Sequence, residues 1–112
     1  MNVKENMENG ISVVTVSGRL DNDGVEELEH KVTERLETGT KRLVFDFSDL
    51  EYINSSGLRV LVMAYQRLHT SGGRVGVCGL RDYILEIFEI SGYDRLFALY
   101  PAKDAALDEL GA

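Results

Sequence analysis

The hydrophobic residues of this chain change their spacing several times along the sequence. A spacing of two residues over a short run is typical of a strand, and a spacing of three or four residues is typical of one face of a helix. With the turn residues between them, these patterns predict strands at 3–7, 11–17, 43–47, 74–79 and 96–100 and helices at 24–38, 55–70, 83–90 and 101–110. Because strands alternate with helices, we expect an α/β fold with a mostly parallel sheet.

The first two predicted strands are separated by Asn9-Gly10, which is a strong signal for a two-residue hairpin turn. The second strand carries apolar residues on both faces, which indicates an interior position in the sheet. Later strands follow helical connections and are expected to run parallel to their neighbours. The sequence therefore predicts a single domain over residues 1–112, with a mostly parallel sheet, one antiparallel edge hairpin, and about four or five helices packed against the sheet.

Polar residues mark the expected starts of three helices. Asp23 followed by Glu26 resembles a capping box for the first helix. Asp82 is the expected cap of the third helix. Pro101 is expected to open the last helix, because its fixed backbone angle suits the first helical position.

The chain is organised around a segment in which an apolar strand runs through a short polar loop into the apolar helix at 55–70. Asn54, Ser55 and Ser56 are all residue types that cap helix N-termini, where backbone N–H groups lack partners. A helix N-terminus also stabilises anions, so a phosphate on Ser56 would change the surface without melting the fold. The alternative is that Ser55 or Ser56 is simply the cap, and spacing alone favours this alternative.

Composition and charge exclude several classes of function. The formal net charge of −7 opposes binding to nucleic acid or to anionic lipid and weakly favours basic protein partners. No apolar run approaches the roughly 20 residues that span a bilayer. The N-terminus lacks the apolar region of a signal peptide. We therefore expect a cytoplasmic protein that binds neither nucleic acid nor membrane.

No arrangement of residues predicts catalysis, a metal site or a cofactor. His30 and His69 lie among polar residues on predicted helices and are expected to be exposed. Cys78 is the only cysteine, falls within a predicted strand and is expected to be a small buried apolar residue. The glycines form no phosphate-binding or dinucleotide pattern, and no Cys/His cluster has metal-ligand spacing. The protein is therefore not expected to be an enzyme.

Two runs in the middle of the chain resemble the signature of the STAS domain, the fold of bacterial anti-sigma factor antagonists. They are Phe45-Asp46-Phe47-Ser48-Asp49-Leu50 and Ile53-Asn54-Ser55-Ser56-Gly57-Leu58. Gly18-Arg19-Leu20-Asp21 is similar to the family's Gly-x-Leu-Asp, and Ser71-Gly72-Gly73 with the strand after it also fits. The resemblance covers most of the chain.

The resemblance implies a phosphorylation switch. The unmodified protein would bind an anti-sigma factor that is a serine kinase and so release a sigma factor. The kinase would then phosphorylate the serine before the glycine, Ser56, and lose its ligand, and a serine phosphatase would reset the switch. An alternative is a phosphorylation-independent STAS scaffold subunit of a signalling or lipid-transport assembly.

The expected docking surface surrounds the phosphoacceptor at the carboxyl ends of the strands. Asn54 stands where the family usually has Asp, and Arg59 stands where it tends to have Gly. Arg59 lies three residues after Ser56, so we expect it to pair with a phosphate there, against the alternative of a solvated arginine. Met63 is either an edge of the core or a partner contact. The predicted partner-binding residues are Asp21, Asn22, Ser48, Asn54, Ser55, Gly57, Arg59 and Met63.

Overall fold

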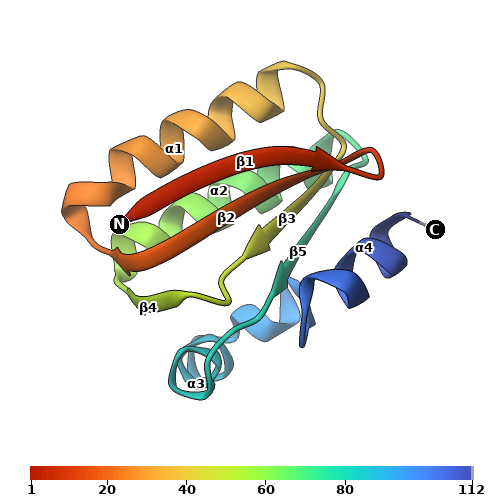
Figure 1. Cartoon of the computed structure of the whole chain (residues 1–112). Helices are drawn as coiled ribbons and strands as arrows, with labels where there is room; N and C mark the ends of the chain where they lie inside the picture. The colour runs from red at the N-terminus through yellow and green to blue at the C-terminus, as the bar shows by residue number, and fades with distance from the viewer. Residues whose placement is uncertain (112) are drawn as a thin grey trace.

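The computed structural model describes residues 1–111, which form one six-stranded sheet with four α-helices (Figure 1). In chain order the elements are β1 (Asn2–Glu8), β2 (Ile11–Leu20), α1 (Asn22–Glu37), β3 (Arg42–Asp46), β4 (Leu50–Ile53), α2 (Ser55–Thr70), β5 (Arg74–Cys78), α3 (Asp82–Ser91), a 3-10 turn (Tyr93–Arg95), β6 (Ala98–Tyr100) and α4 (Lys103–Gly111). The predicted fold class is confirmed.

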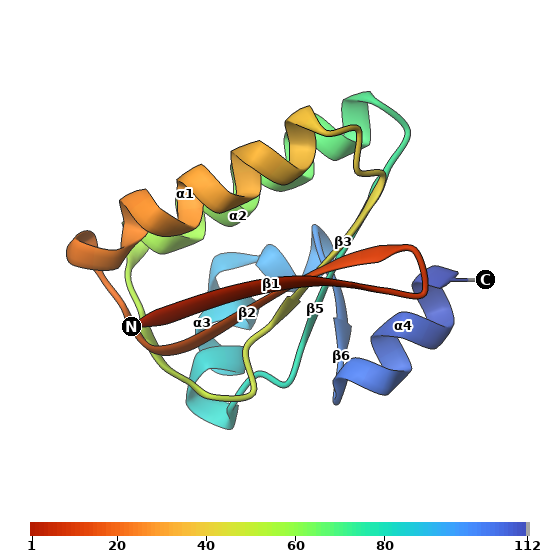
Figure 2. The same ribbon diagram turned by 45° about the horizontal axis from the view of Figure 1, so that its top comes forward.

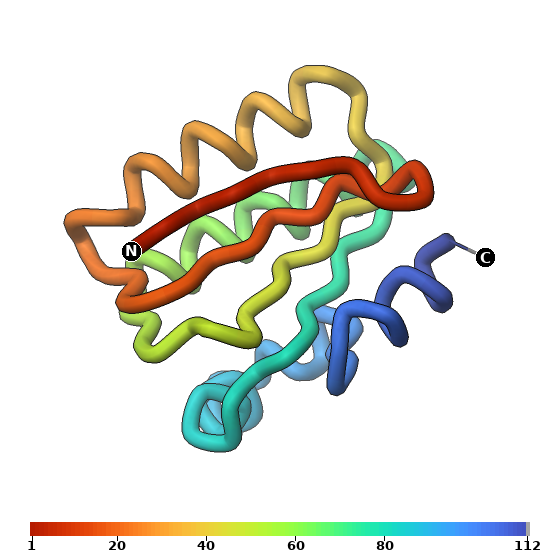
Figure 3. Tube along the Cα trace, viewed as in Figure 1, coloured from red at the N-terminus to blue at the C-terminus, as the bar shows by residue number. Residues whose placement is uncertain are grey.

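The main sheet has the strand order β1-β2-β3-β5-β6, and β4 pairs with β2. Among the described strand pairs, only β1 and β2 are antiparallel. Figure 3 shows the traces of these two strands side by side. At the hairpin turn Asn9 and Gly10 both have positive φ, 54° and 78°. Positive φ at both positions gives the tight turn that matches the twist of paired strands, so the hairpin prediction is confirmed.

Strand β4 lies where the sequence predicted only a polar loop, and that prediction is wrong. β2 pairs with β3 through its first half and with β4 at its end, after an irregularity between Gly18 and Arg19. Leu50 and Ile53 of β4 are buried, and Ile53 is the register partner of Leu20. The chain therefore re-enters the sheet immediately before α2, which fixes the direction in which that helix leaves.

Helices cover both faces of the sheet. α1 and α2 lie together on one face, and α4 lies on the other (Figure 2). The larger core cluster contains buried side chains of α1, α2 and the sheet, and Ile84 and Phe88 of α3 join it. The smaller cluster lies under α4, where Leu107 and Leu110 pack on Val13 and Val44. The face that carries α1 and α2 therefore holds most of the buried apolar surface.

Two predicted caps are wrong. α1 begins at Asn22, and the extended residue Asp21 caps it by accepting the N–H of Asp23 at 3.1 Å. Asp23 is therefore inside the first turn and not at the cap. α3 begins at Asp82, and Arg81 at the cap position makes no side-chain cap bond.

The C-terminal elements differ from the prediction in their bounds. The 3-10 turn Tyr93–Arg95 is followed by Leu96 and Phe97, whose N–H groups both bond back to Tyr93 O, so β6 is shortened to Ala98–Tyr100. The last helix begins at Lys103, two residues after Pro101.

Cys78 is fully buried in β5, as predicted. Burial, with a smaller contribution from the neighbouring Asp46 carboxylate, raises the pKa of its thiol to about 12. The thiol is thus protonated at neutral pH and behaves as a small apolar residue. Within residues 1–111, no helix is both long and apolar enough to cross a membrane.

Candidate functional site

The cap of α2 is Asn54 and not either serine. Asn54 has an extended backbone (φ −102°, ψ −178°), and its Oδ1 accepts the N–H of Gly57 at 3.0 Å. This satisfies one of the donors that a helix start leaves unpaired. The alternative in which Ser55 or Ser56 serves as the cap is therefore wrong, and both hydroxyls are released from that role.

A side-chain bridge joins the starts of α1 and α2. Asn54 Nδ2 donates to Asn22 Oδ1 at 3.0 Å, and Asp21 lies next to Asn22 as the cap of α1. Both helices begin at the same edge of the sheet, near the N-terminus in Figure 1. The structure thus brings together three predicted surface residues, Asp21, Asn22 and Asn54, beside the serine pair.

The two serines differ in exposure. Ser55 is exposed, whereas Ser56 is half-buried. Ser56 lines a hollow of about 290 Å³ between α1 and α2, which we call the serine hollow. Its lining residues are Val25, Glu29, Ser56, Arg59, Val60 and Met63.

Both predicted residues farther along α2 line this hollow. Arg59 is exposed, and Met63 is half-buried and packs against the larger core cluster. Met63 is therefore an edge of the core that also contributes to the surface. The core-edge alternative is thus confirmed, and a partner contact by Met63 stays a prediction.

Gly57 allows the start of α2 to pack closely against the sheet. It is buried, and a Cβ at this position would lie 2.9 Å from side-chain atoms of both Ile53 and Leu20. Contacts this short are below those that real Cβ atoms make. The absence of a side chain at Gly57 therefore allows the serine pair to sit directly over the ends of β2 and β4.

Ser48 makes its hydrogen bonds in the turn that follows β3. Its Oγ donates to Asp46 Oδ1 at 2.7 Å, and a Cβ on Gly79 would collide with it. Strand β4 separates this turn from Asn54 along the chain. Ser48 lies at the carboxyl end of β3, and its contacts with Asp46 and Gly79 hold the turn against the ends of β3 and β5.

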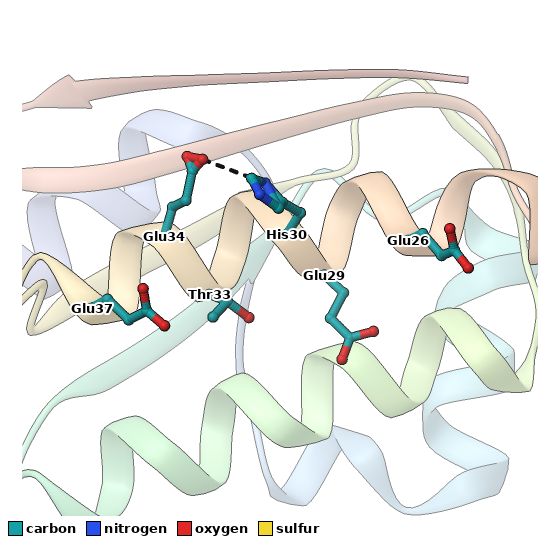
Figure 4. A pocket seen from close by; sticks show the side chains of 6 residues that line it. All are labelled: Glu26, Glu29, His30, Thr33, Glu34 and Glu37. Carbon is teal, nitrogen blue, oxygen red and sulfur yellow. Dashed lines mark ion pairs between the residues drawn. The ribbon is translucent and has the colours of Figure 1, made fainter.

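Acidic side chains dominate the neighbouring surface of α1. Glu26, Glu29, His30, Glu34 and others line a second, open hollow on this helix, where His30 Nδ1 lies 3.4 Å from Glu34 Oε1. Figure 4 shows that Glu29 projects from α1 towards α2. His30 and His69 are both exposed, as predicted. Within residues 1–111, no group of three or more Asp, Glu, His or Cys side chains is placed to hold a metal ion.

Sequence reasoning missed the α1 wall of the serine hollow. Val25 and Glu29 are one helical turn apart, so they share a face of α1. The apolar spacing along α1 is typical of a core-facing stripe that includes Val25, but it does not indicate that this face meets α2 beside Ser56.

Replacing Asn54 with alanine is expected to destabilise the protein by about 1 kcal/mol, within the 0.5–2 kcal/mol range for lost N-caps. The alanine cannot accept the Gly57 N–H, and it also breaks the bridge to Asn22. Urea denaturation measures the effect. Asn54→Asp is the matched control because it keeps the capping oxygen, and a loss as large as that of Asn54→Ala would contradict the capping role.

The STAS domain model matches residues 2–106. The chain belongs to the STAS domain family. Among curated sequences, it is 31% identical over 97 residues to BtrV of Bordetella bronchiseptica, a protein named as an anti-sigma factor antagonist; the match covers 87% of this chain and 84% of the relative.

Solved structures of STAS proteins have the same fold. An anti-sigma factor antagonist from Mycobacterium paratuberculosis matches with a TM-score of 0.91 and 30% identity, covering 99% of this chain and 94% of that one. The antagonist SpoIIAA matches in its unphosphorylated form with a TM-score of 0.79 and 19% identity, over 96% of each chain. Its phosphorylated form from Bacillus matches with a TM-score of 0.78 and 20% identity, over 96% of this STAS domain and 98% of that chain.

Proposed function

We propose that this STAS domain is an anti-sigma factor antagonist whose binding is switched by phosphorylation of the serine pair. The observation that carries the proposal is a pair of hydroxyls at the start of α2 whose capping role is taken by Asn54. An uncommitted, exposed hydroxyl on a rigid helix start is what a kinase needs in an acceptor. The names of the relatives support the same function, and they favour it over a scaffold subunit.

The partners in this proposal are an anti-sigma factor that is a serine kinase and a serine phosphatase that resets the switch. The kinase supplies ATP and Mg²⁺, so this chain needs neither a cofactor nor a metal of its own. It acts as a regulatory binding module and not as an enzyme. These reactions take place in the cytoplasm, where sigma factors and ATP are present.

Exposure favours Ser55 over Ser56 as the phosphoacceptor. Ser55 is exposed, whereas Ser56 is half-buried in the serine hollow and shares it with the Glu29 carboxylate. A kinase must reach the acceptor hydroxyl, and the walls of the hollow leave the Ser56 hydroxyl less accessible than that of Ser55. We therefore move the proposed site from Ser56, named by the family resemblance, to Ser55. Ser56 becomes a hydroxyl of the docking surface.

The rest of the proposed docking surface surrounds Ser55. Asp21, Asn22 and Asn54 are tied together at the two helix starts, and Gly57, Arg59 and Met63 continue along α2. Ser48 stays a prediction for this surface, supported only by its position at the carboxyl end of β3.

Ser55→Ala is expected to abolish phosphorylation by the cognate kinase, and Ser56→Ala is expected to leave most of it. The experiment incubates each variant with the kinase, ATP and Mg²⁺, measures the intact mass, and maps the phosphate by fragmentation. The converse result would assign the phosphoacceptor to Ser56 and contradict the argument from exposure. No phosphate on the unaltered protein would contradict the switch and support the scaffold alternative.

A further inference from the structure

We propose that Arg59 holds the phosphate on the modified serine and makes the phosphorylated site a defined, charge-compensated surface. This inference rests on the proposed phosphorylation of the serine pair. Arg59 lies four residues after Ser55 and three after Ser56 on α2, and these are the two separations at which side chains of a helix are neighbours. A guanidinium forms paired hydrogen bonds to two phosphate oxygens, which an ammonium group does not.

The Arg59 guanidinium is available for this role. Arg59 is exposed, and it takes part in none of the three ion pairs found within 4.0 Å among the described residues. Glu29 lines the same hollow without forming an ion pair with Arg59. The other nearby arginine, Arg19 on β2, lies with its guanidinium carbon 4.3 Å from the ring centre of Tyr52. Arg59 is thus the cation that the hollow offers to an arriving anion.

Charge balance explains why a phosphate here needs this cation. The N-terminal half of α1 carries Asp23, Glu26, Glu27 and Glu29, and Asp21 follows the end of β2. The adjacent Asn22 and Asn54 are neutral. A phosphoserine adds about −1.5 to −2 charges at pH 7. The N-terminus of α2 offsets part of that charge, and Arg59 is the one charged side chain lining the serine hollow that can offset the rest.

Holding the phosphate has a consequence for regulation. A phosphate bound by Arg59 lies back along α2, over the hollow lined by Ser56, Val60 and Met63. A partner that docks on this face then meets a fixed anion and a covered hollow. Without Arg59, the phosphate would rotate freely in solvent. The partner and a phosphatase would then meet a more mobile phosphate group.

The test uses protein with phosphoserine incorporated during translation at position 55, so that no kinase is required. The second pKa of the phosphate is measured by phosphorus NMR from pH 4 to pH 9, a range of about two units or more on each side of the usual value near 6. A neighbouring cation favours the dianion and lowers this pKa. We expect Arg59→Ala to raise the pKa by about half a unit, the size expected for a partly exposed pair.

Two control variants make the result specific. Arg67→Ala removes the same charge from another exposed position of α2, twelve residues after Ser55 and therefore about 18 Å along the helix. It is expected to leave the phosphate pKa unchanged. The phosphate pKa in Arg59→Lys is expected to lie between the values of the unaltered protein and Arg59→Ala, because lysine keeps the charge but loses the paired hydrogen bonds.

The titration is repeated with phosphoserine at position 56, and a higher phosphate pKa in Arg59→Ala at either position supports the inference. Equal phosphate pKa values in the unaltered protein, Arg59→Ala and Arg67→Ala at both positions would overturn it. Because the phosphate is introduced without a kinase, these outcomes are independent of whether the serine pair is a kinase substrate. Failure of the proposed function and failure of the Arg59 inference are therefore distinguishable.

Discussion

Phosphoserine at position 55 is expected to weaken binding to the anti-sigma partner by at least 100-fold. The phosphate adds roughly two charges and bulk in the proposed contact, beside Asn22 and Asn54. Arg59 offsets only about one of these charges, and burying the remaining charge in an interface costs several kcal/mol, whereas a 100-fold loss corresponds to about 2.8 kcal/mol. Isothermal titration calorimetry of the unmodified and the phosphoserine protein against the same partner measures the difference.

The loss of affinity is expected without a loss of fold. Ser55 is exposed at the first position of α2, and its hydroxyl is not the group that caps the helix. A phosphate at a helix N-terminus is stabilised by the helix and does not unfold it. Ser55→Ala is the matched control: it removes only a hydroxyl from the docking surface, and it is expected to bind much more tightly than the phosphoserine protein. Comparable affinity before and after modification would contradict the switch, and an unfolded phosphoprotein would contradict its mechanism.

Gly57→Ala is expected to destabilise the protein by about 1–3 kcal/mol, the usual cost of overpacking a core. Alanine is otherwise favoured over glycine in a helix by about 1 kcal/mol, so a loss of stability would be specific to this position. The added Cβ would collide with Leu20 and Ile53 and would push the start of α2 away from the sheet. Urea denaturation measures the change in the free energy of unfolding.

Gly111→Ala is the matched control for this prediction. Gly111 is also helical, and a Cβ there would meet only Ile11 at 3.8 Å, which is an ordinary contact. Gly111→Ala is expected to leave the free energy of unfolding unchanged or to raise it slightly. If Gly57→Ala is as stable as this control, the close seating of α2 on β2 and β4 is wrong. If it is destabilised, weaker partner binding is also expected, because the serine pair moves with the helix start.

The sequence predicted α2 at its observed bounds because three local signals agree there. Leu58, Leu61 and Leu68 give a helical stripe, Asn54 is a strong cap, and a glycine pair follows the helix. Strand β4 was missed because its two buried residues, Leu50 and Ile53, are separated by two exposed residues, Glu51 and Tyr52. Their spacing of three does not match the alternation of a strand, so only pairing with β2 identifies it.

The sequence could predict which elements meet at the site, but not which side chain of the serine pair is exposed and which is half-buried. Parallel strands end at one edge, so the approach of Asp21 and Asn22 to Asn54 was expected. Two adjacent serines, however, give no information about which one faces solvent. That difference depends on how α1 packs against α2, and the same packing creates the hollow shared by Ser56 and Glu29.

The measurement that tests the account most directly is the release of a sigma factor from its complex with the anti-sigma partner. We expect the unmodified protein to release the sigma factor and the protein phosphorylated on the serine pair to release little or none. Both forms are expected to unfold at similar urea concentrations. Equal release by the two forms, or an inactive phosphoprotein that is also unfolded, would contradict a switch that acts through docking on an intact fold.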